Sequence, residues 1–127
     1  MAVAILAGCA TQLPIGRISD RMDRRKVVIA VCLLAALGAI GAWWLAEVSR
    51  LVFFAMVAAY GGMSLTLYSL SSAHVNDHVP ADEKLGASST LILVNGAGAF
   101  IAPMVVAAIM QLIGNDVFLP LLAVMHV

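Results

Sequence analysis

The chain has 127 residues, of which 63% are hydrophobic and 11% are charged, and its formal net charge is zero. A soluble domain carries roughly 25% charged residues, so this composition indicates a membrane protein and excludes an ordinary soluble domain. Seven basic residues balance seven acidic ones, which argues against nucleic acid as a partner. Cys9 and Cys32 both lie within apolar runs, where we expect small buried side chains rather than disulfide partners or metal ligands.

Charged residues divide the sequence into five apolar segments. A helix needs roughly 20 residues to cross about 30 Å of hydrocarbon. Unpaired backbone groups are costly in lipid, so each segment is predicted to be a helix. We interpret the first and last segments as incomplete, and the predicted fold class is all-α, a polytopic membrane helix bundle forming part of a larger fold. The predicted transmembrane segments are residues 1–15, 27–46, 51–73, 85–113 and 117–127.

The first connection, GRISDRMDRRK from Gly16 to Lys26, contains five of the seven basic residues. Basic residues next to membrane segments stay on the cytoplasmic side, so we expect this connection inside. Alternation then predicts that residues 47–50 lie outside, 74–84 inside and 114–116 outside. Trp43 and Trp44 fall at the outer end of the second segment, at the headgroup level that aromatic side chains prefer.

The order of residues in this connection resembles the signature loop of the major facilitator superfamily of secondary transporters. That loop has a glycine, an acidic-basic pair four residues later, and then a basic pair. In this sequence Asp23 replaces the family's usual second glycine, and aspartate tolerates turn conformations. The matching residues are Gly16, Asp20, Arg21, Asp23, Arg24 and Arg25.

The resemblance implies that this loop is a conformational latch, which stabilises one state of an alternating-access cycle from the cytoplasmic face. On physical grounds, Gly16 would let the helix end approach a neighbour, and Asp20 could accept hydrogen bonds from arginines. The alternative is an anchor that binds only anionic headgroups.

Two further runs, Tyr60–Asp77 and Ala87–Pro103, resemble the second half of one group of bacterial facilitator proteins. The resemblance implies that the five segments are helices eight to twelve of twelve, and that the missing transporter half is a partner. Because the two halves of the superfamily are repeats, helices two to six are the alternative assignment.

Small residues four apart predict faces where helices pack closely, since lipid provides no hydrophobic force between helices. The pairs are Gly38 with Ala42, Ala58 with Gly62, and Gly98 with Ala102. Pro80 is predicted to start the fourth helix, because proline suits the first helical position. Gly96, Gly98 and Pro103 predict a helix kink near the middle of that segment.

Polar residues gather at the end of the third segment. We interpret His74, Asn76 and Asp77 as a cytoplasmic gate or helix-end network, with a solvated boundary as the alternative. His74, Asp77 and His78 share one helix face and could in principle hold a metal. The run lies where the chain leaves the lipid, however, so we predict neither a metal nor a cofactor.

Tyr60, Ser64 and Tyr68 recur every four residues along one helix, and with Asn95 they are the possible pore-facing residues. Interhelical hydrogen bonding is the alternative for this stripe. A proton relay needs a carboxylate or a histidine at depth. We expect no ionisable residue there, which leaves proton coupling to the missing half or implies a uniporter or a largely uncharged solute. The polar residues expected at depth are Ser64, Thr66, Tyr68, Ser69, Ser71, Ser72, Thr90 and Asn95.

These observations predict a fragment of a secondary active transporter in the bacterial inner membrane. It would move a small solute by alternating access and would be inactive by itself, with membrane lipid around it. We predict that it is not an enzyme, because the sequence has no nucleophile elbow or phosphate loop. One alternative is a small membrane-embedded partner or assembly protein without transport activity. The other is a membrane enzyme using the face formed by His74, Asp77 and His78.

Overall fold

The structure, a computed structural model, describes residues 2–45 and 47–127, with side chains from residue 5 onward. Met1 and Ala46, at the edges of predicted segments 1–15 and 27–46, lie outside the described residues. Every regular element in the described part of the chain is a helix, which confirms the all-α class. The elements are α1 (Ala2–Ser19), α2 (Arg24–Leu45), α3 (Arg50–His78), α4 (Lys84–Ile113), η1 (Asn115–Val117) and α5 (Phe118–Val124).

Three of these helices, α2, α3 and α4, are long and apolar enough to cross a membrane. The longest two, α3 and α4, have 29 and 30 residues. At 1.5 Å per residue a helix of this length spans about 43 Å, more than the hydrocarbon thickness of about 30 Å. These helices therefore extend into the headgroup layers or tilt.

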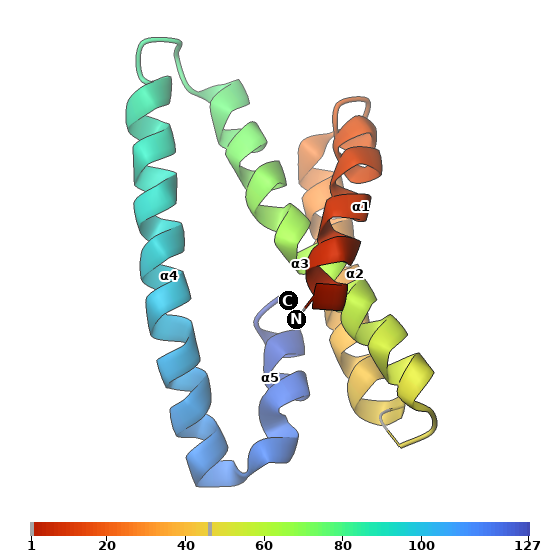
Figure 1. Ribbon diagram of the computed structural model, residues 1–127. Coiled ribbons are helices and arrows are strands. Elements are labelled where there is room, and N and C mark those ends of the chain that lie inside the picture. The colour runs from red at the N-terminus through yellow and green to blue at the C-terminus, as the bar shows by residue number, and fades with distance from the viewer. Residues whose placement is uncertain (1, 46) are drawn as a thin grey trace.

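The first three helices form a bundle in which α3 crosses both α1 and α2 (Figure 1). At one end of the bundle, Val27 and Val31 of α2 pack against Leu70 of α3. Ile15 of α1 packs against the same cluster. The bundle therefore has a contiguous apolar interior, although much of its outer surface is exposed leucine, isoleucine and tryptophan, as expected of a surface that faces lipid.

Two of the three predicted small-residue pairs lie at close helix contacts. A Cβ added at Gly38 would lie 3.0 Å from the backbone nitrogen of Tyr60, and one at Gly62 would lie 3.1 Å from Thr11 Oγ1. A side chain at either position would require neighbouring atoms to move by a few tenths of an ångström, so both positions favour glycine. The third pair is different, since a Cβ at Gly98 would meet nothing within 4 Å. The expectation that Gly98 mediates close packing is therefore wrong within the described residues.

Threonine hydroxyls add hydrogen bonds to the α1–α3 contact. Thr11 Oγ1 lies 3.0 Å from the carbonyl oxygen of Gly62 and 3.4 Å from Thr66 Oγ1. It also bonds to its own helix at Ala7 O, 2.9 Å away. The Gly62 carbonyl also accepts from Thr66 Oγ1 at 2.7 Å, and Thr11, whose one hydroxyl hydrogen is shared with Ala7 O, is a second donor that reaches it from the neighbouring helix.

The remaining helices form an arm on one side of the bundle. In Figure 1, α4 stands beside the bundle, and α5 returns toward α2 after a reversal at Gly114. Gly114 has a φ of 123°, a backbone conformation that favours glycine, and it is the sole positive φ in the described part of the chain. Ala123 of α5 then packs against Ala36 and Ala39 of α2.

Three expectations need correction at this level. First, α4 begins at Lys84 rather than at Pro80, because residues 80–83 form a turn in which Glu83 N donates to Pro80 O over 3.1 Å. Second, Cys9 is exposed and Cys32 is only partly buried, where small buried side chains were expected. Third, a Cβ at Gly16 would meet nothing within 4 Å, so Gly16 makes no close helix contact in the described residues. The proline-containing helix α4 is continuous through Pro103.

Candidate functional site

The loop between α1 and α2 is short because Asp23 caps the second helix. The carbonyl of Asp23 accepts the first helical hydrogen bonds, from Lys26 N at 3.0 Å and Val27 N at 3.2 Å. Its side-chain Oδ1 accepts from Arg25 N at 3.0 Å. This is the geometry of an N-cap residue, for which aspartate is among the best. The sequence thus keeps a tight connection without the family's second glycine and without a positive φ.

Arg24 joins the loop to α3 through two ion pairs. Its Nη2 lies 3.0 Å from Asp20 Oδ1, and its Nε lies 2.5 Å from Asp77 Oδ2. Of the three side chains, Arg24 is the least exposed to solvent, with 22% of its side chain exposed, against 66% for Asp20 and 50% for Asp77. A guanidinium suits this role because its fork of N–H groups can serve two carboxylates at once.

Two histidines on the last turn of α3 adjoin these ion pairs. The rings of His74 and His78 lie 4.5 Å apart, and His78 Nδ1 is 2.8 Å from the carbonyl oxygen of His74. We call Asp20, Arg24, His74, Asp77 and His78 the polar cluster. It borders a polar cavity of about 330 Å³, which Ser19, Asp23 and Arg25 also line.

Three buried polar atoms in or beside the polar cluster have unused hydrogen-bonding capacity. Ser19 Oγ, His74 Nδ1 and Asn76 Oδ1 have no hydrogen-bond partner among the described residues. Ser19 is 1% exposed. Burying a polar atom without a partner costs free energy, so Ser19 Oγ and His74 Nδ1, whose residues line the cavity, favour the entry of water or another polar group.

The structure therefore joins part of the predicted latch loop to part of the predicted gate. Arg24 pairs with Asp20 of the loop and with Asp77 of α3, and His74 lines the same cavity. Arg21 is exposed at the surface. In the described residues, no group of three histidine, cysteine, aspartate or glutamate side chains is placed to hold a metal ion. Asp77, one of the three residues considered for such a site, pairs with Arg24 instead.

A second polar group lies half-way along α3. Tyr60 and Ser64, two of the predicted pore-facing residues, contact His126, which follows α5. His126 Nε2 is 3.2 Å from Ser64 Oγ, and its ring packs edge to face on Tyr60 with centroids 5.3 Å apart. We call Tyr60, Ser64 and His126 the interior group. Tyr68 and Asn95 are exposed and do not join it.

One ionisable residue that the sequence analysis did not consider, His126, lies beside Ser64 half-way along α3. Ser64 is the central residue of the 29-residue helix α3, so we expect its neighbours near the middle of the membrane if α3 spans it symmetrically. Sequence reasoning missed His126 because a polar residue near the end of a segment resembles a boundary residue.

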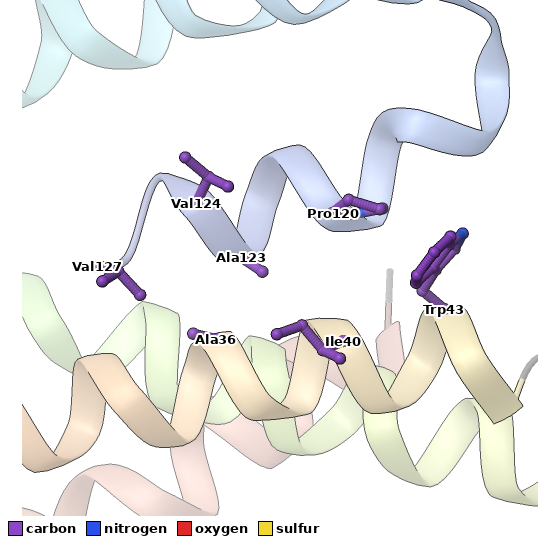
Figure 2. Close-up of a pocket in the computed structure, with 7 residues that line it drawn as sticks. All are labelled: Ala36, Ile40, Trp43, Pro120, Ala123, Val124 and Val127. Carbon is purple, nitrogen blue, oxygen red and sulfur yellow. The ribbon is translucent and has the colours of Figure 1, made fainter.

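An apolar groove lies between α2 and α5, next to their packing contact (Figure 2). The α2 side of the groove is lined by Ala36, Ile40 and Trp43. The opposite side is lined by Pro120, Ala123 and Val124 of α5 and by Val127, which follows this helix. The groove encloses about 560 Å³. Its lining carries no charged residue, so it offers packing space to lipid or helix rather than chemistry.

Together, the long apolar helices, the lipid-type surface and a charged network confined to one end define an integral, multi-pass helical membrane protein. A family model described as Major Facilitator Superfamily matches residues 1–126, so this chain belongs to that superfamily of membrane transporters.

Relatives with curated names agree with this assignment. The chain is 30% identical over 114 residues to a protein of Escherichia fergusonii named "Uncharacterized MFS-type transporter YcaD", a match that covers 87% of this chain and 28% of the relative. It is 26% identical over 123 residues to the protein of the same name from Escherichia coli, covering 97% of this chain and 31% of that relative. The chain thus spans about a third or less of the relatives it matches. No solved structure matches it.

Proposed function

We propose that this chain forms part of a secondary transporter that moves a small solute by alternating access, and that the polar cluster stabilises one of its two conformations. The observation that carries the proposal is the Arg24 guanidinium, which pairs with Asp20 beside the α1–α2 loop and with Asp77 at the end of α3. Such a bridge ties the loop to a separate helix and breaks when the helix end moves by a few ångströms.

Charge and exposure support a switching role for this bridge. Both carboxylates are half exposed or more, so water can replace the arginine at modest cost when the pair opens. The basic loop favours a cytoplasmic position for the cluster, since lysine and arginine are retained on that side. The relatives from Escherichia favour the bacterial inner membrane.

The chain by itself is proposed not to transport. Alternating access requires two bundles that rock about a shared site near the membrane midplane. The chain spans 28–31% of the relatives that it matches. We place its helices as helices eight to twelve of a complete transporter, on the runs Tyr60–Asp77 and Ala87–Pro103. An enzymatic role is disfavoured because Asp77, on the face considered for catalysis, is held by Arg24.

Solute accumulation tests the proposal. Everted membrane vesicles carrying the complete transporter would be incubated with a mixture of small metabolites, and their contents compared by mass spectrometry. Wild-type vesicles are expected to accumulate at least one solute that Asp77→Ala vesicles accumulate at least five-fold less, a factor equivalent to about 1 kcal/mol. Asp82→Ala, which removes an exposed carboxylate from the next turn, is the matched control and should behave as wild type.

Two outcomes would overturn the proposal. Contents identical in wild-type vesicles and in vesicles without the protein would remove the transport function and favour a membrane-embedded partner protein. Equal accumulation by wild type and Asp77→Ala would remove the role of the polar cluster.

A further inference from the structure

The basic residues at the start of α2 line two different surfaces. Arg24 and Arg25 border the polar cavity, as do Asp20 and Asp23. Lys26 instead borders an apolar groove between α1 and α2. Successive residues of a helix are about 100° apart, so Arg24 and Lys26 project about 200° apart, from nearly opposite faces of α2. The helix therefore separates the lysine from the acidic side of the polar cluster.

The groove runs from the α1–α2 loop toward the middle of the bundle and encloses about 210 Å³. Lys26, Ala30 and Leu34 are four residues apart and form one ridge along its α2 side. Lys26 and Leu34 are about 12 Å apart along the helix axis. Ile18 lines the groove from α1 and Met63 lines it from α3. The groove is thus an elongated apolar space with a lysine at its loop end.

Lys26 contributes both an apolar and a charged part to this groove. The lining is apolar throughout, so the methylene stem of Lys26 faces the groove and its ammonium group lies at the rim. In the described part of the loop, the ion pairs are made by Arg24. The exposed Lys26 ammonium is therefore available to a negative group outside the chain.

Charge and shape together select the occupant of the groove. The connection from Gly16 to Lys26 has five basic and two acidic residues, an excess of three positive charges. A free anion would gain nothing from an apolar lining. A second copy of the chain would bring its own basic loop to the same depth, where like charges repel. An anionic phospholipid has both the apolar chain that fits the groove and the negative group that fits the lysine.

We propose that the groove between α1 and α2 binds one acyl chain of an anionic phospholipid of the cytoplasmic leaflet, whose phosphate accepts a hydrogen bond from Lys26. The latch and the anchor considered for this loop then belong to different residues, Arg24 and Lys26. The lipid site requires the loop to lie at the cytoplasmic surface, as its basic residues predict. It does not depend on transport.

The test uses nuclear magnetic resonance of the full 127-residue chain with ¹³C-methyl-labelled methionine, at one chain per nanodisc of phosphatidylcholine. Phosphatidylglycerol with a nitroxide near the middle of one acyl chain is added, and phosphatidylcholine with the same label is added in parallel. Met63→Leu assigns the signal from the groove, and Met104, which is 62% exposed on α4, reports general contact with lipid. Labelled phosphatidylglycerol is expected to broaden the Met63 signal about five-fold more than labelled phosphatidylcholine, the factor that one lysine supplies at an anionic surface. Met104 should respond equally to both lipids.

A pair of lysine variants tests the headgroup contact. Lys26→Gln should abolish the preference of the Met63 signal for phosphatidylglycerol. Lys84→Gln makes the same change in charge at the other lysine of the chain, which follows Asp82 and Glu83, and should retain the preference.

A second pair of variants tests the chain contact. Ala30→Phe adds a ring to the ridge that borders the groove, so the Met63 signal should lose its broadening by both labelled lipids. Ile29→Phe places a ring at the neighbouring exposed position of α2 and should behave as wild type. The other methionine signals of each variant must match wild type, which shows that the variant is folded.

Four results would overturn the proposal: equal broadening of the wild-type Met63 signal by the two lipids, equal losses in Lys26→Gln and Lys84→Gln, undiminished broadening in Ala30→Phe, or a shift of Met63 by inorganic phosphate alone. A Met63 response that follows the number of chains per nanodisc instead of the lipid would assign the groove to a second copy and also overturn it. The measurement requires no solute flux. A negative result therefore leaves the transport proposal standing, and vesicles that accumulate no solute leave the lipid site standing.

Discussion

The bundle of α1, α2 and α3 and the arm of α4 and α5 have similar compositions but very different packing. In the bundle, Gly38 and Gly62 lie against neighbouring backbone or side-chain atoms, and Thr11 crosses between helices. In the arm, Gly86, Gly96 and Gly98 have open space around them. Small residues therefore do not by themselves create a helix contact. A contact also requires a complementary surface on the opposite helix, which the described chain supplies to the bundle but not to most of α4.

The largest expected effect comes from filling the bundle contact at Gly38. Gly38→Leu would place side-chain atoms against the Tyr60 backbone, where the first added carbon already lies at 3.0 Å and 3.2 Å from backbone atoms. We expect the free energy of unfolding in detergent micelles to fall by about 3 kcal/mol, the upper range for overpacking. Gly98→Leu is the matched control, and a loss similar to that of Gly38→Leu would show that α4 is packed as tightly as the bundle.

Removing the interhelical hydroxyl is expected to have a smaller effect. Thr11→Val keeps the shape of the side chain and removes the donor to Gly62 O, so the free energy of unfolding should fall by about 1 kcal/mol. In the arm, the Thr90 hydroxyl bonds to Gly86 O within its own helix. Thr90→Val should therefore change the stability little. Equal losses in the two variants would contradict the contrast between bundle and arm.

The cap of α2 allows a local test. Asp23→Ala removes the acceptor for Arg25 N and should cost about 1 kcal/mol. Amide hydrogen exchange of Arg25 should accelerate several-fold, whereas amides in the middle of α2 should not change. Asp23→Asn restores an acceptor and should recover most of the protection, and a failure to do so would mean that the charge rather than the cap matters.

The smallest effect on stability is expected at the ion pairs. A double-mutant cycle of Arg24→Ala and Asp77→Ala should give a coupling free energy of less than about 1 kcal/mol, because Asp77 is half exposed. Unfolding in detergent micelles measures this value. A coupling free energy several-fold larger would mean that the ion pair mainly stabilises the fold, which contradicts its role as a switch.

The sequence alone predicted the elements of the bundle well but the contacts of the arm poorly. Charges and length located the helices, and the loop motif pointed to the residues that meet at Arg24. Hydrophobic periodicity carries no information about which helix faces which, so Gly98 was predicted at a close contact that no described residue makes with it. His126 was missed for the same physical reason: the turn at residues 114–116 was predicted, but no pattern in the sequence places the residues after α5 beside Ser64.

The continuous helix α3 contributes residues to both the polar cluster and the interior group. A tilt of this helix therefore moves its end much farther than its middle. Asp77 lies about 13 residues beyond Ser64, or about 20 Å along the helix axis. A tilt of about 10° around Ser64 would leave the interior group almost in place while it moved Asp77 by about 3.4 Å, more than the length of its ion pair with Arg24. A small tilt of α3 about Ser64 thus produces a large displacement of Asp77, even if the helix does not bend.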